Sequence, residues 1–183
     1  MTKVLSGLAA QSSGSVLPPI FITQHMLEEF TELLAEQLAR NSGLDCREAE
    51  DGEKVAPGRI YLAPGDCHMV IGGAPDAPVI SLLQSPPVHF CRPAADPMLE
   101  SLAIAYGKNT LAVILTGMGT DGSTGCKKIK AAGGTILVQD AASSAVWGMP
   151  GAVAAAGDAD AVIPLDDMAT AIIARLSGKG GVI

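Results

Sequence analysis

Two polar residues at the ends of apolar runs carry the side chains best suited to chemistry. His25 follows the apolar run 20–23, and Asp121 closes the glycine-rich segment 116–122, which follows the apolar run 111–115. A neutral imidazole can take a proton from an alcohol near pH 7, and a carboxylate can orient it and stabilise its charged form. The two residues therefore predict the base half of a nucleophilic site.

Each of these residues also has a structural explanation, which the sequence leaves open. His25 could simply begin a helix, and Asp121 could cap a helix over residues 123–132. The glycines of segment 116–122 permit tight turns and bare backbone N–H groups, as in an anion nest or an oxyanion hole. A small-molecule α/β enzyme that binds an anion in this loop is a further alternative, but the loop has no basic residue.

The other histidines and the cysteines are weaker candidates. His68 opens a predicted hairpin and is expected to make a structural hydrogen bond, while His89 lies in a proline-rich stretch, 86–90, that is expected to be extended and to line a groove. The three histidines lack metal-ligand spacing, and the four cysteines form no C-x-x-C pair. Neither Walker-type nor dinucleotide-binding glycine motifs occur. No metal and no organic cofactor is predicted.

Alternating helix and strand patterns supply the elements that must position these residues. Short apolar runs predict strands at 20–23, 44–49, 59–63, 68–71, 79–83, 111–115, 135–139 and 161–164. Helical spacing predicts helices at 2–8, 27–41, 97–106, 123–132, 152–156 and 166–176, with Asp166 or Asp167 as the cap of the last. The predicted fold class is α/β, a doubly wound, mostly parallel sheet with a β-hairpin-rich insertion over 44–83. Ligands of such sheets bind beyond the carboxyl ends of the strands, where His25 and Asp121 lie.

Composition excludes several classes of protein. The 183 residues suit one domain, and 48% hydrophobic with 17% charged residues is a globular balance. The net charge of −7 disfavours binding to nucleic acid. The sequence shows no membrane-length apolar run and no signal peptide, so a soluble, cytoplasmic protein is expected.

Six motifs in series resemble the catalytic domain of the chemotaxis protein-glutamate methylesterases (CheB). They match in order and spacing, and they cover nearly the whole chain. They are Thr23-Gln-His-Met26, Glu48-Ala-Glu-Asp-Gly-Glu53 with Pro57-Gly58, Tyr61-Leu-Ala-Pro-Gly65 with His68, Leu115-Thr-Gly-Met-Gly-Thr-Asp-Gly122, Gln139-Asp-Ala-Ala-Ser143, and Gly148-Met-Pro150.

The resemblance implies a serine hydrolase that cleaves glutamate γ-methyl esters on chemoreceptor helices, and many such enzymes also deamidate receptor glutamines. It implies His25 as general base, Asp121 as the residue that orients it, and the backbone N–H of Met118 as an oxyanion donor. The implied partners are methyl-accepting chemotaxis receptors, with no nucleic acid and no membrane insertion. The expected domain spans residues 1–177, followed by a tail at 178–183, and no receiver domain is expected.

The chain departs from the family pattern at the nucleophile. The family carries its serine in a Gly-Ala-Ser-Thr-Gly-Gly turn after the first strand, and the helix that follows ends in a Val-Leu pair that resembles Val4-Leu5. The serine turn and the first strand are therefore expected to lie before residue 1, as if the domain were N-terminally truncated. Activity of this chain is expected to depend on that missing turn, and a non-catalytic receptor-binding homologue is the alternative. No substitute serine is found, because Ser6, Ser12, Ser13 and Ser15 are wrongly placed.

A second departure lies in the segment 91–94. The family usually reads Arg-Pro-Ser where this chain has Arg92-Pro-Ala94, and Cys91 stands where a basic or imidazole side chain is common. Both changes are expected to alter how substrate is handled, because the segment is expected beside the substrate groove.

Overall fold

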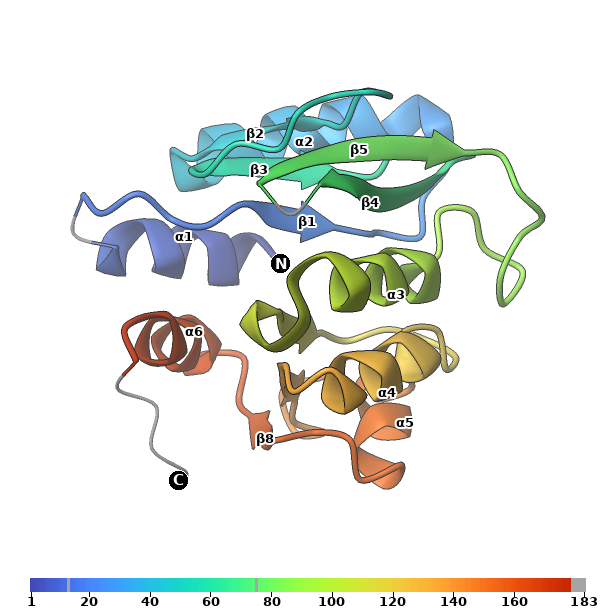
Figure 1. The fold of residues 1–183 in the computed structure, drawn as a ribbon. Helices are drawn as coiled ribbons and strands as arrows, with labels where there is room; N and C mark the ends of the chain where they lie inside the picture. Colours follow the sequence, from blue (N-terminus) through green and yellow to red (C-terminus); the bar gives the residue numbers. More distant parts are fainter. Residues whose placement is uncertain (13, 75, 179–183) are drawn as a thin grey trace.

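A parallel sheet in two parts forms the middle layer of the fold (Figure 1). The computed structural model describes residues 1–12, 14–74 and 76–178. In one part, β3 (Arg59–Leu62) pairs in parallel with β1 (Ile20–Ile22) on one side and β2 (Asp45–Glu48) on the other. In the other part, β7 (Thr135–Gln139) pairs in parallel with β6 (Leu111–Ile114) and β8 (Ala161–Ile163). The α/β fold class predicted from the sequence is confirmed.

Helices cover both faces of the sheet. The helices α1 (Thr2–Gln11), α2 (Glu28–Ser42) and α6 (Met168–Leu176) pack on one face, and α3 (Ala95–Tyr106), α4 (Ser123–Ala131) and α5 (Met149–Ala155) on the other. A short 3-10 turn, η1 (Gly107–Asn109), joins α3 to β6. Successive side chains of a strand point to opposite faces. Ile60 and Leu62 therefore pack in the core beneath α1, α2 and α6, while Tyr61 and Ala63 pack in the core beneath α3, α4 and α5. The strands can therefore be apolar throughout, as the short runs predicted.

The middle of the chain differs from the predicted β-rich insertion. Only β4 (His68–Ala74) and β5 (Ala77–Leu83) form an antiparallel hairpin, which packs against α3. The strands β2 and β3 belong to the main parallel sheet. The hairpin is also longer than predicted, because Gly72, Gly73 and Pro78 lie in its two strands.

Several helix boundaries and one helix face were predicted wrongly. The first helix continues to Gln11, and α5 begins at Met149 rather than at 152. Asp167 is the N-cap residue of α6, but its side chain makes no capping bond, and Asp166 instead pairs with Lys3. Residues 179–183 of the predicted tail lie outside the described part of the chain.

Helical spacing alone places Phe30, Leu33, Leu34, Gln37 and Leu38 on one face of this helix, but the buried face of α2 is a different one. Thr31, Ala35 and Leu38 are buried, whereas Phe30 and Leu33 are about half exposed. The helix is turned so that its small and β-branched residues face the sheet, and two large apolar side chains face solvent.

A strand-shaped gap separates the two parts of the sheet. Within the described residues, β1 pairs with β3 alone and β6 pairs with β7 alone, so each has one free edge. Both free edges line a cavity of about 430 Å³, bounded by residues 17–25 on one side and 109–117 on the other. Helices α1, α3 and α6 and Met149 of α5 contribute the remaining walls. We call this cavity the slot.

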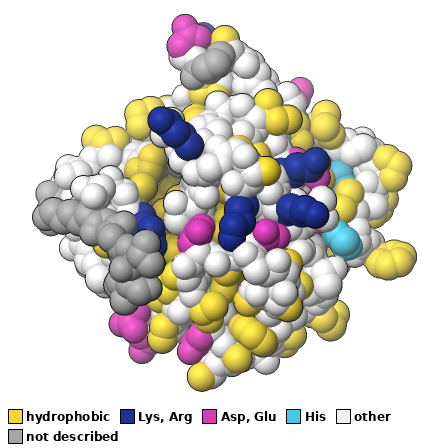
Figure 2. Space-filling view, turned by 60° about the horizontal axis from the view of Figure 1, so that its bottom comes forward, with side chains coloured by type: hydrophobic (Ala, Val, Ile, Leu, Met, Phe, Trp, Pro, Cys, Tyr) yellow, Lys and Arg dark blue, Asp and Glu magenta, His cyan; other side chains and the backbone are white. Residues whose placement is uncertain are grey.

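The surface carries charges of both signs. On the face shown in Figure 2, lysine and arginine side chains are interspersed with acidic ones. Histidine side chains lie at one edge of that face, and hydrophobic side chains protrude beside them. Within the described residues no helix has both the length and the apolar character needed to cross a membrane.

Candidate active site

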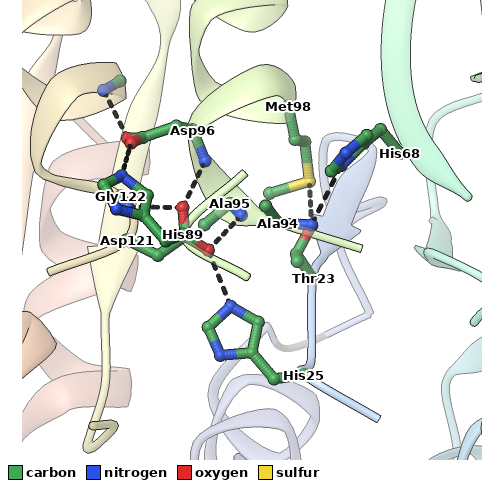
Figure 3. Close-up of polar contacts among 11 residues, drawn as sticks. Thr23, His25, His68, His89, Ala94, Ala95, Asp96, Met98, Asp121 and Gly122 are labelled. Atoms are coloured by element: carbon green, nitrogen blue, oxygen red, sulfur yellow. Dashed lines mark hydrogen bonds and ion pairs between the residues drawn. The ribbon is translucent and has the colours of Figure 1, made fainter. Parts of the chain in front are cut away.

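The two residues singled out by the sequence meet at the carboxyl ends of the strands. His25 follows β1 and Asp121 follows β6, and His25 Nε2 lies 2.6 Å from Asp121 Oδ2 (Figure 3). The carboxyl ends of β1 and β6 therefore lie at the same edge of the two-part sheet. His25 lines the slot, and 27% of its side chain is exposed, whereas Asp121 is almost fully buried. With Nε2 committed to Asp121, Nδ1 is the ring nitrogen left to exchange a proton with a third group.

Four donors converge on the Asp121 carboxylate. Oδ2 accepts from His25 and from the Ala95 amide at 2.6 Å, while Oδ1 accepts from the amides of Asp96 at 3.0 Å and Gly122 at 2.9 Å. Burial by itself would raise the pKa of this carboxyl, but the hydrogen bonds from His25, Ala95 and Asp96 outweigh burial and lower the pKa. Asp121 is therefore held as an anion, the form that orients and stabilises an imidazolium.

Asp121 and Asp96 cap each other's helices. Asp121 stands just before α4 but accepts the first two amides of α3, and Asp96 in α3 accepts the Gly125 amide of α4 at 2.7 Å. We call this arrangement the crossed caps. The sequence had suggested Asp121 as the cap of the helix at 123–132, and that suggestion is wrong, since the N-cap of α4 is Gly122. Helix N-termini carry partial positive charge, which favours the Asp121 carboxylate as an anion.

A fixed peptide unit presents the Met118 amide. The Gly117 carbonyl accepts from the amides of Gly148 at 3.0 Å and Met149 at 2.8 Å, at the start of α5. The C=O and N–H of one planar trans peptide point in opposite directions, so the Met118 N–H is aimed away from α5. No described residue accepts from it. Thr116 and Gly117, which directly precede Met118, line the slot.

Two supporting residues had no assigned role in the sequence. Gln139 is fully buried at the end of β7, where Oε1 accepts from the Thr116 amide at 2.8 Å and Nε2 donates to the Ser143 carbonyl at 2.8 Å. Gly148 packs so tightly that a Cβ there would lie 2.7 Å from the Gly117 oxygen. The motifs 139–143 and 148–150 marked both positions, but only their long-range contacts show that they hold the loop at 116–118.

A clamped loop leads from β5 to α3 beside this site. At its tip, Val88 and Cys91 exchange backbone hydrogen bonds of 3.0 and 2.9 Å around the two residues His89 and Phe90. Both tip residues have positive φ, 51° and 63°, where side chains other than glycine cost about 1–3 kcal/mol each. His89 is therefore in a tight turn, and the prediction of an extended segment is wrong. Its Nε2 lies 2.9 Å from Asp96 Oδ2.

The base of the same loop is held by two side chains. Arg92 donates to Asp66 Oδ1 and to the carbonyls of Gln84 and Ser85. His68 is buried, its Nδ1 accepts from the Ala94 amide at 3.1 Å, and its Nε2 lies 3.2 Å from the Pro86 carbonyl. His68 makes the structural hydrogen bonds expected of it.

The segment 91–94 does not have the setting that the sequence suggested. Ala94 is completely buried, so a hydroxyl in its place would not face a groove. It is the N-cap residue of α3, but no cap is lost, because Asp121 takes the first two amides and Pro97 has no N–H. Burial, and then the charge of Asp121, raise the pKa of the Cys91 thiol. Cys91 is therefore a poor nucleophile.

The serines 6 and 12 lie away from the site. Ser6 donates to the Asn41 carbonyl on α2, and Ser12 donates to the Ala9 carbonyl at the end of α1. Ser15 precedes β1 and lies far from its carboxyl end, and Ser13 lies outside the described residues. The positions of Ser6, Ser12 and Ser15 agree with the expectation that none of these three replaces the nucleophile.

One group of possible metal ligands adjoins the site. Donor atoms of His89, Asp96 and Asp121 all lie within 4.8 Å of one another. The carboxylates, however, already accept from five backbone or imidazole donors other than His89. We therefore describe the group as a hydrogen-bond network between two helix starts.

The chain is similar to known proteins over most of its length. The family model for CheB methylesterase matches residues 1–172. The protein-glutamate methylesterase/protein-glutamine glutaminase 1 of Paramagnetospirillum magneticum is 54% identical over 162 residues, which are 88% of this chain and 42% of that protein. The protein-glutamate methylesterase/protein-glutamine glutaminase of Azospirillum brasilense is 52% identical over 167 residues, which are 91% of this chain and 42% of that protein.

A solved structure shares the fold. The crystal structure of the Thermotoga maritima CheB methylesterase catalytic domain superposes with a TM-score of 0.88 at 38% identity, covering 94% of this chain and 91% of that one. The chain spans less than half the length of the two curated relatives named above. On the family match, the identities and the shared fold, the chain belongs to the CheB methylesterase family.

Proposed function

We propose that this chain is part of a cytoplasmic protein-glutamate methylesterase that hydrolyses glutamate γ-methyl esters on chemoreceptors and also deamidates receptor glutamines. The observation that carries the proposal is the contact of 2.6 Å between His25 Nε2 and Asp121 Oδ2 at the mouth of the slot. The Met118 amide supports it, because it offers an unused donor from the neighbouring strand end.

The proposed chemistry is acyl transfer through a serine. His25 Nδ1 takes the serine proton as the serine oxygen attacks the ester carbonyl, and Asp121 stabilises the resulting imidazolium. The Met118 N–H donates to the oxyanion of the tetrahedral intermediate. The imidazolium then protonates the leaving methoxide, which departs as methanol. Water, deprotonated by His25 in turn, attacks the acyl-enzyme, and the imidazolium returns the proton to the serine oxygen as the glutamate carboxylate is released.

We place the nucleophile on a strand that fills the slot. The free edges of β1 and β6 are two rows of unpaired backbone groups facing one cavity, which is the arrangement a single parallel strand would satisfy. The carboxyl end of such a strand would emerge between His25 and Thr116. Met1, at the start of α1, also lines the slot, so a short turn can join that strand to α1.

The test is release of methanol from a methylated receptor fragment. One protein is residues 1–183 alone, and the other is extended at its N-terminus by a strand and a Gly-x-Ser-x-Gly-Gly turn. Release by the extended protein, abolished by His25→Ala, is the expected result. An extended protein that folds but releases no methanol contradicts the proposal, and binding without release in that experiment would instead indicate a non-catalytic homologue.

A further inference from the structure

We infer that Phe90 is a docking residue that inserts into an apolar groove between helices of the substrate protein, next to the ester that is hydrolysed. The inference rests on the proposed function and adds to it the part of the surface that selects a protein substrate. It starts from the loop between β5 and α3, which stands out from the body at the right of Figure 1.

The Phe90 side chain does not pack against the rest of the protein. Its side chain is fully exposed, at 102% of the reference area, and within the described residues its ring makes no aromatic contact. Exposed large apolar side chains are common singly, but this one sits at a turn position with φ of 63°, where glycine or asparagine is favoured. Folding alone would not favour phenylalanine at this position.

The backbone of the loop that carries Phe90 is held in place by hydrogen bonds. The tip is closed by the paired hydrogen bonds between Val88 and Cys91, and the base is fastened by Arg92 and His68. A loop backbone held in this way loses little conformational freedom when Phe90 binds a partner. Rigid aromatic residues that enter a pocket on the partner are the usual energetic centres of protein interfaces.

The position of the tip ties it to the chemistry. His89, its neighbour at the tip, contacts Asp96, and the Asp96 amide donates to Asp121. The docking residue is thus joined to the catalytic carboxylate through two hydrogen bonds. Met118, three residues before Asp121, has a side chain that is 82% exposed and offers a second apolar contact. A protein that accepts Phe90 in a groove would bring a side chain near that groove to the site.

The experiment compares Phe90→Gly with Ile104→Ala, a matched control at an 88% exposed apolar residue of α3. Affinity of the chain for a labelled, methylated receptor cytoplasmic fragment is measured by fluorescence anisotropy. Phe90→Gly should weaken binding by about tenfold or more, and Ile104→Ala should leave it unchanged. The melting temperature of Phe90→Gly should rise, because glycine relieves the positive φ. If Phe90 had a merely structural role, Phe90→Gly would lower both the affinity and the melting temperature.

Hydrolysis separates this inference from the proposed function. In the extended protein, Phe90→Gly should lower kcat/KM for the receptor ester relative to that for a small glutamate γ-methyl ester by about tenfold. If the extended protein hydrolyses the receptor ester and Phe90→Gly changes neither affinity nor this ratio, docking is refuted and the proposed function stands. If nothing is hydrolysed but Phe90→Gly still weakens binding, the proposed function fails and docking stands. Loss of self-association as the sole effect of Phe90→Gly would refute docking in favour of an interface between copies.

Discussion

Asp121→Asn should lower the free energy of unfolding far more than His25→Ala, which removes the partner imidazole. Asparagine keeps one acceptor oxygen and turns an NH₂ group toward two of the four donors that now surround the carboxylate. Two hydrogen bonds to a charged acceptor are lost at a site that solvent does not reach. At roughly 1.5–3 kcal/mol each, the expected cost is about 3–6 kcal/mol in the free energy of unfolding.

His25→Ala provides the comparison. The imidazole makes one hydrogen bond, is partly exposed, and leaves Asp121 with three amide donors when it is removed. Its removal should cost about 1 kcal/mol. Asp166→Asn, at an exposed pair with Lys3, is the control and should stay within about 0.5 kcal/mol of the parent.

Urea unfolding at pH 7, followed by circular dichroism, measures the three differences. The pH dependence adds a second measurement, because the pKa of Asp121 is lowered from its ordinary value of 3.8 in the folded protein. Its stabilising contribution is complete above that value and is lost as the pH falls from there through the folded pKa. The stability difference between the parent and Asp121→Asn should therefore shrink in this window. An equal cost for His25→Ala and Asp121→Asn would refute the crossed caps as the reason for the difference.

Three further predictions concern the supporting residues. Gly148→Ala brings a Cβ to 2.7 Å from the Gly117 oxygen, so the loop must move and methanol release by the extended protein should fall about 100-fold; a rate within threefold of the parent would contradict this. Gln139→Leu leaves the buried Thr116 amide without its acceptor and should cost about 2–3 kcal/mol in urea unfolding; a cost under about 0.5 kcal/mol would mean that water replaces the side chain. Burial raises the pKa of Cys126 to about 12, so its thiol should react with a disulfide reagent only on unfolding; rapid labelling of Cys126 in the native protein, read by mass spectrometry, would contradict its burial.

The sequence predicted the parallel strands and the meeting of His25 with Asp121 because these depend on local patterns. Apolar runs such as 111–115 have no polar face, which is typical of strands buried on both sides. Residues that follow parallel strands lie at the same edge of the sheet, so two strand ends sufficed to place a site.

The remaining features depend on contacts that no local pattern encodes. Asp121 precedes one helix and caps another, so its position in the sequence pointed to the wrong N-terminus. His89 lies in a stretch rich in prolines, which favours extended backbone, but the pairing of Val88 with Cys91 forces a tight turn. The outward turn of Phe30 in α2 likewise depends on which face meets the sheet, a choice that spacing alone does not make.

The crossed caps also change how the sequences of relatives should be interpreted. A relative that has lost its activity would still need a carboxylate at position 121 to start α3, so selection for folding alone would preserve it. The imidazole at position 25 caps no helix, so its replacement would lower the free energy of unfolding only slightly. A survey of genomes that seeks lapsed enzymes in this family should therefore score the histidine, because an intact aspartate reports a foldable protein and not a working one.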